Sequence, residues 1–332
     1  MIGDMQKWTP NVAGIIEHAR EIHPETEIIS RLVSGEIHRS NYEKVCIRSR
    51  KLASALEKDG VKKGDVIATL ALNTYRHLEM YYGISGMGAI THTLNFRLHP
   101  EQAVYIINHA EDKIIFVELP FVPILEALQE NLKTVEKYVV LCEVDEMPET
   151  ILKNAISYEE YIQDGDENYS WPTLEDDAAC ALCYTSGTTG NPKGVLYSHK
   201  SNVIHAQAAL TAMTIKPDDT ILMVVPLFHV LAWGIPYFGP MNGLKLVMPG
   251  MQMEGEPLFE LIDQEDVTLA FGVPTIWMGL LAYCRDNNKI LSSVKNTIIG
   301  GSALSLATLQ EFDEVHDVNV IHAWGMTEMS PL

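Results

Sequence analysis

The sequence predicts an α/β fold in which mostly parallel sheets are covered by helices. Short apolar runs of strand length alternate with amphipathic segments of helical length along most of the 332 residues. Several of these runs are apolar throughout, as strands buried on both faces are. Polar or turn-forming residues bound each run. A chain that alternates strand and helix in this way builds parallel sheets whose connections are helices.

Strand and helix signals are clear in the first half of the chain. A capping box, Ser40-x-x-Glu43, predicts a helix that runs to about residue 58. Pro100, at a first helical position, predicts another that runs to residue 110. Further helices are expected at residues 75–87 and between the last two strands of this half. The expected strands lie at residues 66–72, 89–93, 114–117 and 138–141.

Residues 143–177 interrupt the alternation because they are rich in Asp and Glu and hold a single lysine, Lys153. We interpret them as a solvated acidic linker with a short helix. The linker divides the chain into a first α/β subdomain at residues 1–142 and a second at residues 178–332. The strands expected in the second subdomain lie at residues 179–184, 220–225, 244–248, 268–271, 296–300 and 319–323.

The charge of the chain argues against a nucleic-acid partner. Lys plus Arg is 24 and Asp plus Glu is 44, so the formal net charge is −20. Such a surface repels phosphate backbones and anionic membranes. An anionic substrate would therefore need a local pocket of backbone donors, a lysine and a metal. The N-terminal residues show no basic-then-apolar signal pattern, so we expect a cytoplasmic location.

Two features have both a functional and a structural interpretation. Cys180 and Cys183 form a C-x-x-C, but they lie in an apolar run expected to be a buried strand, which favours a structural role.

Residues 221–244 contain no Lys, Arg, Asp or Glu and are long enough to span a bilayer. The prolines and glycines inside this stretch favour a buried strand, loop and helix that line a pocket, so no integral membrane segment is expected.

The strongest functional signal is the string YTSGTTGNPKGV at residues 184–195, which follows the expected strand at residues 179–184. Its glycines let the backbone approach a phosphate, its hydroxyl and N–H groups donate to phosphate oxygens, and Lys193 supplies positive charge. It is not a Walker A loop, because the spacing differs and no Ser or Thr follows Lys193. The string predicts a phosphate-binding loop of another kind.

This string resembles the phosphate loop of the adenylate-forming superfamily: acyl-CoA synthetases, luciferases and peptide-synthetase adenylation domains. Three more blocks follow in that family's order. PLFHVLAW at residues 226–233 resembles the acyl-pocket motif, and GGSA at residues 300–303 resembles the segment beside the adenine. HAWGMTE at residues 322–328 resembles the x-x-Y-G-x-T-E motif, with Trp324 in place of the usual Tyr.

The four blocks are more informative together than apart. His229 and Trp233 taken alone would more often be core residues, but four blocks in order make that interpretation improbable. The resemblance covers the whole chain and is greatest to bacterial fatty-acyl-CoA synthetases and methylmercaptopropionate-CoA ligases. It implies that the chain is the large N-terminal domain of the adenylate-forming fold.

The resemblance also implies an activity and a set of site residues. The activity is ATP- and Mg²⁺-dependent activation of a fatty or other carboxylic acid to acyl-adenylate and then, with coenzyme A, to acyl-CoA. Glu328 would bind Mg²⁺ together with Thr185, since this hard cation prefers oxygen ligands, and Thr327 would contact the α-phosphate. The residues implied to hold the β- and γ-phosphates are Thr185, Ser186, Gly187, Thr188, Thr189, Gly190 and Lys193.

A second group of residues is implied to surround the acid and the adenine. His229 would lie at the acyl pocket, and Trp233 would be a gate or wall of the acyl tunnel. The bulk of Trp233 and Trp324 favours a short- or medium-chain acid. The residues implied to border the adenine and the acyl carboxylate are Gly301, Ser302, Ala323, Trp324 and Gly325.

The family pattern continues beyond the motifs found here, with an aspartate that holds the ribose, a hinge, and a C-terminal lid whose lysine reaches the α-phosphate. The sequence ends at Leu332, so none of these elements maps onto it. We expect a shortened gene or an expressed fragment that lacks the lid, because the four blocks are intact. Two alternatives stay open: a non-catalytic nucleotide- or acyl-binding homologue, and adenylation without transfer to CoA. Whether the chain forms a homodimer also stays open.

Overall fold

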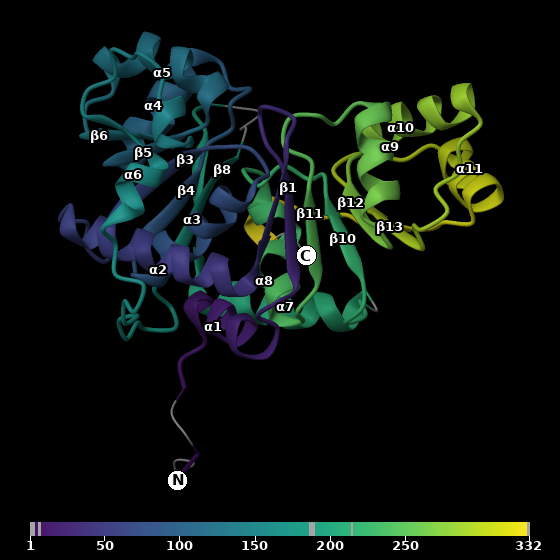
Figure 1. Ribbon diagram of the computed structural model, residues 1–332, viewed down its shortest axis with the longest axis horizontal. Coiled ribbons are helices and arrows are strands. Elements are labelled where there is room, and N and C mark those ends of the chain that lie inside the picture. The colour runs from purple at the N-terminus through teal and green to yellow at the C-terminus, as the bar shows by residue number, and fades with distance from the viewer. Residues whose placement is uncertain (1–3, 6–7, 186–189, 214, 331–332) are drawn as a thin grey trace.

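The strands of the protein form two seven-stranded sheets, which lie side by side with helices on their outer faces and between them (Figure 1). The structure is a computed structural model that describes residues 4–5, 8–185, 190–213 and 215–330. Within these residues the strands form two sheets of seven strands each. The predicted fold class, mostly parallel sheets covered by helices, is confirmed.

The first sheet has the strand order β7-β6-β5-β3-β4-β8-β9. All neighbouring strands are parallel except β8 and β9, which are antiparallel. Its strands are β3 (Val66–Leu70), β4 (Ile90–Thr93), β5 (Ile114–Val117), β6 (Lys137–Val140), β7 (Ala155–Ser157), β8 (Ala179–Thr185) and β9 (Lys193–Ser198).

The second sheet has the strand order β14-β13-β12-β10-β11-β1-β2. Here only β1 and β2 pair in the antiparallel sense. Its strands are β1 (Glu27–Arg31), β2 (Ile37–Asn41), β10 (Thr220–Met223), β11 (Lys245–Met248), β12 (Leu269–Gly272), β13 (Asn296–Ile299) and β14 (Asn319–His322).

The helices form layers around the two sheets. Those between the sheets are α1 (Val12–Ile22), α2 (Tyr42–Lys58), α3 (Tyr75–Gly86), α7 (His199–Ala212) and α8 (Ile235–Met241). The outer face of the first sheet packs against α4 (Pro100–Ala110) and α5 (Val122–Leu128). The outer face of the second packs against α9 (Gly255–Gln264), α10 (Pro274–Asn287) and α11 (Leu306–His316). The short helix α6 (Tyr158–Gln163) packs against α2.

Several central strands are mostly apolar, as expected where both faces of a strand are buried. Side chains alternate between the two faces of a strand. Ile221 and Met223 of β10 therefore join the core between the sheets, whereas Leu222 joins the core under α9, α10 and α11. In the first sheet, Ile67 of β3 faces α2 and α6, and Ala68 faces α4 and α5. Because neighbouring strands here are parallel, their carboxyl ends lie at a common edge, where loops are free to form a site.

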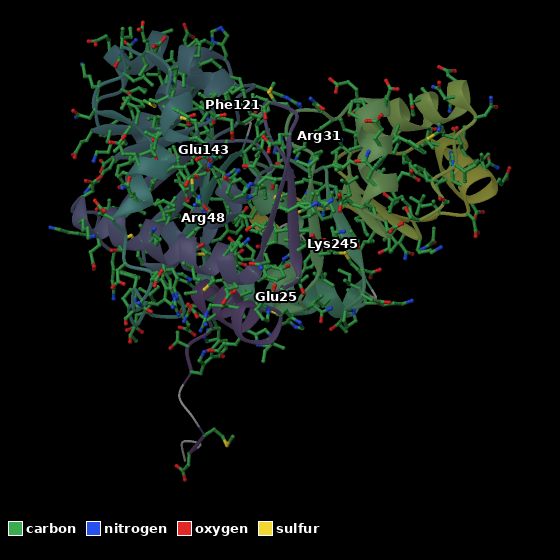
Figure 2. All side chains as sticks on the ribbon, in the orientation of Figure 1. Glu25, Arg31, Arg48, Phe121, Glu143 and Lys245 are labelled. Atoms are coloured by element: carbon green, nitrogen blue, oxygen red, sulfur yellow. The ribbon has the colours of Figure 1, made fainter. Side chains whose placement is uncertain are left out.

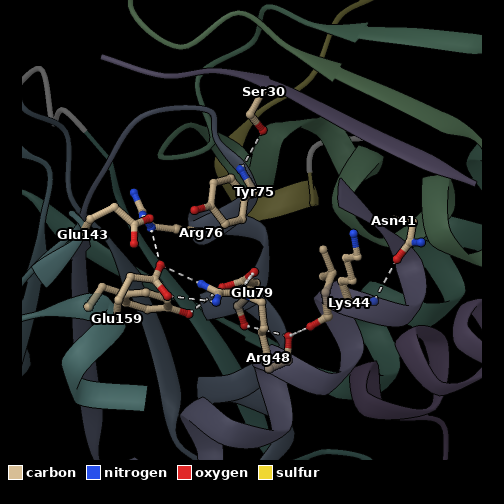
Figure 3. Close-up of polar contacts among 12 residues, drawn as sticks. Ser30, Asn41, Lys44, Arg48, Tyr75, Arg76, Glu79, Glu143 and Glu159 are labelled. Carbon is tan, nitrogen blue, oxygen red and sulfur yellow. Dashed lines mark hydrogen bonds and ion pairs between the residues drawn. The ribbon is translucent and has the colours of Figure 1, made fainter. Parts of the chain in front are cut away.

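A group of ion pairs joins the helices that flank the first sheet (Figure 3). Arg48 of α2 lies 2.7 Å from the fully buried Glu79 of α3 and 2.8 Å from Glu159 of α6. Arg76 of α3 shares Glu159 at 3.0 Å and also pairs with Glu143. Figure 2 shows Arg48 and Glu143 in the half of the molecule built on the first sheet, and Arg31 and Lys245 in the other half. The pairs compensate charges that would otherwise be costly to bury.

Most of the predicted elements are confirmed to within about three residues. The helix α4 begins at Pro100, as predicted. The predicted capping box is wrong, because Ser40 is paired with Ile28 in the β1–β2 hairpin. The N-cap of α2 is Asn41, whose side chain accepts a hydrogen bond from the backbone N–H of Lys44 at 2.9 Å.

The division of the chain at residues 143–177 stays a prediction about domains, but both sheets cross it. β1 and β2 precede residue 142 and yet complete the second sheet. β8 and β9 follow residue 178 and yet complete the first. Residues 143–177 contribute the helix α6 and an edge strand, β7, which was not predicted. A local pattern predicts strands but does not say which sheet they join.

The two features with alternative interpretations are both structural. Cys180 and Cys183 are free and buried in β8, and burial raises the pKa of Cys180 to about 12, so its thiol is unreactive. Residues 221–244 form β10, the 3₁₀ turn η4 (Val230–Gly234) and α8. Within the described residues, no helix is both long enough and apolar enough to cross a membrane.

Candidate functional site

A cavity of about 300 Å³ lies at the carboxyl ends of the strands of the second sheet. Its walls come from the segments that follow β10, β12, β13 and β14 and from the end of α7. In open α/β sheets, ligands bind outside the carboxyl ends of the strands. The predicted site residues that line this cavity are His229, Trp233, Gly301, Ser302, Ala323, Trp324 and Gly325. The lining residues that the sequence did not single out include Met213, Val225, Val230, Val273 and Ile298.

The strand β13 positions one wall of the cavity. Beyond its last residue the backbone N–H of Gly300 donates to the carbonyl of Gly272 at 3.3 Å. The N–H of Ala323 donates to the carbonyl of Ile299 at 2.8 Å, which aligns the segments after β13 and β14. Gly301 has φ = +86°, a conformation that a glycine adopts without strain. The two predicted blocks at residues 300–303 and 322–328 therefore meet at one edge of the sheet.

The wall that contains Trp233 has an unusual backbone. Leu231, Ala232 and Trp233 have φ values of 39°, 43° and 52°, and Gly234 follows at 81°. Left-handed residues other than glycine cost roughly 1–2 kcal/mol each, so they persist only where packing holds them. Leu231 and Ala232 are buried, and the Trp233 indole packs against Gly300. The turn therefore places the indole in the cavity wall.

A buried asparagine holds the segment that carries the predicted acyl-pocket motif. The side-chain nitrogen of Asn73 donates to the carbonyls of Met223 at 2.7 Å and Val225 at 2.8 Å. Its side-chain oxygen accepts from the N–H of Leu227 at 2.8 Å. The hydroxyl of Tyr81 also donates to the carbonyl of Leu227. Sequence reasoning missed Asn73, which directly follows the strand expected at residues 66–72 and belongs to no recognised motif.

His229 lines the cavity, with its ring 4.9 Å from that of Phe228. The residue is exposed, but nearby protein atoms still remove part of the water around its imidazole. Desolvation, and after it the positive charge of Arg97, lower the pKa of His229. The ring is therefore neutral at neutral pH and presents one donor and one acceptor.

The antiparallel pair β8–β9 carries the predicted phosphate loop. Thr185, at the end of β8, is paired with Lys193, at the start of β9, and its hydroxyl donates to the Lys193 carbonyl at 3.4 Å. Gly190 has φ = +93°. Lys193 is exposed, and no carboxylate of the described chain lies within ion-pair distance of it. The predicted residues Ser186, Gly187, Thr188 and Thr189 lie outside the described residues.

The Thr327-Glu328 motif lies beside this hairpin. Both residues belong to the 3₁₀ turn η5 (Thr327–Met329), which packs against β8. The hydroxyl of Tyr197 in β9 donates a hydrogen bond to the carbonyl of Thr327. The pKa of Tyr197 is raised, mainly by burial and further by the negative charges of Cys183 and Glu328 when ionised. The structure thus brings Thr185 and Glu328 onto elements that touch each other.

The oxygen donors at this place fit a metal that arrives with a nucleotide. Glu328 offers an exposed carboxylate and Thr185 a hydroxyl. Across residues 4–5, 8–185, 190–213 and 215–330, no cluster of three or more His, Cys, Asp or Glu side chains could hold a metal by itself. Mg²⁺ at nucleotide sites is usually bound by one or two carboxylates together with phosphate oxygens and water. The residues therefore suit Mg²⁺ bound with ATP and do not form an all-protein metal centre.

Comparison with protein-family models shows to which family the chain belongs. The model of the AMP-binding enzymes matches residues 16–332. The chain belongs to the AMP-binding enzyme family. This confirms the resemblance that the four sequence blocks indicated.

Named relatives of this AMP-binding chain are acid–CoA ligases. It is 45% identical to a medium-chain-fatty-acid–CoA ligase of Ectopseudomonas oleovorans, over 100% of this chain and 61% of the relative. It is 44% identical to a 3-methylmercaptopropionyl-CoA ligase of Ruegeria pomeroyi, over 100% of this chain and 62% of the relative. The chain thus spans about three fifths of the length of these relatives.

A solved structure shows which part of the fold is present. The chain superimposes on the inhibitor-bound N-terminal domain of FACL13 from Mycobacterium tuberculosis with a TM-score of 0.85 and 22% identity. The match covers 97% of this chain and 77% of that one. The protein therefore has the fold of the large N-terminal domain of an AMP-binding enzyme.

Proposed function

We propose that this chain is the ATP- and acid-binding part of an AMP-forming acid–CoA ligase. The observation that carries the proposal is the meeting of separate sequence blocks at one edge of the second sheet. The segments around Trp233, Gly301 and Trp324 line a single cavity, and η5 links its rim to the β8–β9 hairpin. Because the relatives are longer than the chain, the activity of the whole protein stays a proposal.

The proposed reaction has two steps. The carboxylate of the acid attacks the α-phosphorus of ATP, which gives acyl-adenylate and releases pyrophosphate. The thiol of coenzyme A then attacks the acyl carbon and releases AMP. A carboxylate is a weak nucleophile and the phosphate is anionic, so catalysis depends mainly on positioning and on neutralising charge.

The predicted phosphate and metal residues each have a role in the first step. Lys193 and the backbone around Gly190 bind the β- and γ-phosphates, and Thr327 contacts the α-phosphate. When bound, Mg²⁺ neutralises the phosphate oxygens, and Glu328 with Thr185 would hold it there. The remaining phosphate-loop residues assigned to this role are Ser186, Gly187, Thr188 and Thr189.

The acid is proposed to lie against the apolar wall of the cavity. Trp233, Val225 and Ile298 offer apolar surface to an alkyl chain, and Ser302 and Gly301 border the place of its carboxylate. The relatives act on medium-chain fatty acids and 3-methylmercaptopropionate, and we propose an acid of this short to medium size. A cytoplasmic location and a homodimer stay predictions.

The test measures binding and turnover separately. Calorimetry of residues 1–332 with ATP and Mg²⁺ should show binding, and Lys193→Met should weaken it by about tenfold to a hundredfold, since a charge-assisted hydrogen bond contributes about 1.5–3 kcal/mol. Lys153→Met is the matched control, because Lys153 is an exposed lysine outside the cavity that pairs with Glu130. Acid-dependent pyrophosphate release is then measured on the full-length gene product. An equal loss of ATP affinity in both variants would contradict the proposal. Pyrophosphate release that does not depend on an added acid would contradict it as well.

A further inference from the structure

A second cavity, of about 150 Å³, lies in the half of the molecule built on the first sheet. It is enclosed by the end of β3, by the segment that follows β4, and by α4 and α5. Leu70, Leu94, Ile106 and Leu125 contribute to its wall, and Asn95 is the one polar residue that lines it. The function proposed above makes no use of this cavity.

The composition of the wall selects an apolar occupant. A buried water needs two to four polar partners, which this wall does not supply. An apolar cavity of roughly 150 Å³, lined by Leu, Ile and Phe in an engineered protein, stays dry and binds benzene or xenon. The cavity in this chain therefore has room for about six carbon atoms.

A positive charge lies next to one of the lining residues. Arg97 stands between two lining residues, Phe96 and Leu98, and its guanidinium carbon lies 5.5 Å from the centre of the Phe96 ring. Arg97 is exposed, and in the described part of the chain it makes no ion pair. Ile124, another lining residue, is 39% exposed, so this part of the cavity wall reaches the protein surface.

We propose that this cavity is a second binding site for a short fatty acid, with the alkyl chain inside and the carboxylate on Arg97. The site is separate from the cavity that contains Trp233, although aromatic rings connect the two. Phe96 stacks on Phe121 at 4.6 Å and meets Phe228 edge-on at 4.9 Å. Figure 2 shows Phe121 in the half built on the first sheet, toward the other half. Since Phe228 adjoins His229, an occupant that moves Phe96 changes the surroundings of the first cavity.

The binding test uses hexanoate and methyl NMR of residues 1–332. Hexanoate should shift the methyl signals of Ile106, Ile107 and Leu125. From butyrate to hexanoate, each added methylene should tighten binding at these signals by about fourfold, the value expected for burial of one CH₂. Beyond hexanoate the gain should stop, because the cavity is full. Affinity that does not depend on chain length would overturn the proposal.

Two variants test where the acid lies. Ala103→Phe fills the cavity and should abolish the shifts at Ile106 while those at Ile298, in the first cavity, stay. Arg97→Gln, an exposed substitution that does not threaten folding, should weaken hexanoate about tenfold at the Ile106 signals and leave 1-hexanol unchanged there, since only the acid carries a charge. Equal effects on acid and alcohol would overturn the role of Arg97.

The outcome separates this inference from the proposed function. Shifts confined to Ile298 and Val225 would overturn the second site and support acid binding in the first cavity. Shifts confined to Ile106, Ile107 and Leu125 would support the second site and count against acid binding in the first. Shifts at both places that respond separately to Ala103→Phe support both proposals.

Discussion

A Cβ atom on Gly300 would lie 2.9 Å from Cη2 of Trp233. The same atom would lie 3.0 Å from the carbonyl oxygen of Ala323. No side chain fits between the end of β13 and the indole without movement. The wall of the first cavity therefore depends on a glycine at this position.

The variant Gly300→Ala tests this dependence. The added methyl group should displace the Trp233 indole and lower the free energy of unfolding by about 1–3 kcal/mol, the usual cost of overpacking. Acid binding in the cavity and Trp fluorescence should change with it. The control is Gly279→Ala in α10, where a Cβ meets nothing within 4 Å, so it should be neutral or stabilising. Equal effects of both substitutions would contradict the packing argument.

Trp233→Ala should extend the range of acids that the protein accepts. Removal of the indole opens the apolar wall, and each further CH₂ that it then buries contributes about 0.8 kcal/mol. We expect affinity or kcat/KM to shift toward longer or bulkier acids across a chain-length series. Trp8→Ala, at an exposed tryptophan outside the cavity, is the control. If affinity or kcat/KM depends on chain length in the variant as it does in the unmodified protein, Trp233 only packs in the core and does not limit the acid.

Asn73→Asp should disturb the acyl-pocket segment. The substitution keeps the shape of the side chain but turns an acceptor oxygen toward the carbonyls of Met223 and Val225. A buried group without its partner costs about 1–3 kcal/mol, and more when it is charged. We expect urea denaturation to show a loss of at least this size, together with weaker acid binding. Asn168→Asp in an exposed loop is the control, and an equally small effect of both would contradict the role of Asn73.

Glu118 should make stability depend on pH. Its carboxylate accepts from the N–H of Leu72 at 3.1 Å, and burial raises the pKa of Glu118 to about 7. In the unfolded chain the pKa is about 4.3. Between these values the folded protein keeps a proton that the unfolded chain releases, so stability falls as pH rises through this window, by about 3–4 kcal/mol in total.

Glu118→Gln should remove this slope, because the amide keeps an acceptor for Leu72 and does not ionise. The free energy of unfolding of the unmodified protein should therefore fall from pH 4.5 to pH 7, whereas that of the variant should lack this contribution. The difference, variant minus unmodified protein, should increase over this pH range. Glu149→Gln, at an exposed glutamate, is the control. A constant difference across this pH range would show that Glu118 does not titrate there.

The sequence predicted the central strands and the motif blocks well because their signals are local. In a run such as residues 66–72, the side chains on both faces of the strand are mostly apolar, and this can be read from the sequence without knowing which sheet the strand joins. Four strands were not predicted: β1, β2, β7 and β9. Of these, β2 and β9 are partly exposed edge or hairpin strands, and residues such as His38, Arg39 and Lys193 break their apolar pattern. Long-range pairing then decides that these strands complete sheets formed by distant parts of the chain.

The site was predictable only where a motif marks it. The strings around His229, Gly301 and Trp324 were recognisable, and the structure brings them to one cavity. Asn73 has no such mark, because a polar residue after a strand does not reveal which backbone groups it will meet. The left-handed turn at residues 230–233 was equally hidden, since it contains no glycine and is held by its neighbours.

Glu328→Gln should weaken the Mg²⁺ dependence of ATP binding. Glu328 is the exposed carboxylate of η5, a turn that Tyr197 ties to β9 and that packs against β8, which ends at Thr185. Loss of its charge should lower metal affinity by at least about tenfold, the effect seen for residues that only support a ligand. Folding should survive because the side chain is exposed.

The measurement is ATP affinity of residues 1–332 by calorimetry over a series of Mg²⁺ concentrations. In the unmodified chain ATP should bind more tightly as Mg²⁺ increases, whereas in Glu328→Gln the curve should shift to higher Mg²⁺. Glu314→Gln is the matched control, since Glu314 is an exposed glutamate on α11. Superimposable Mg²⁺ curves for all three proteins would contradict the assignment of Glu328 as a metal ligand and leave the metal to the phosphates and water alone.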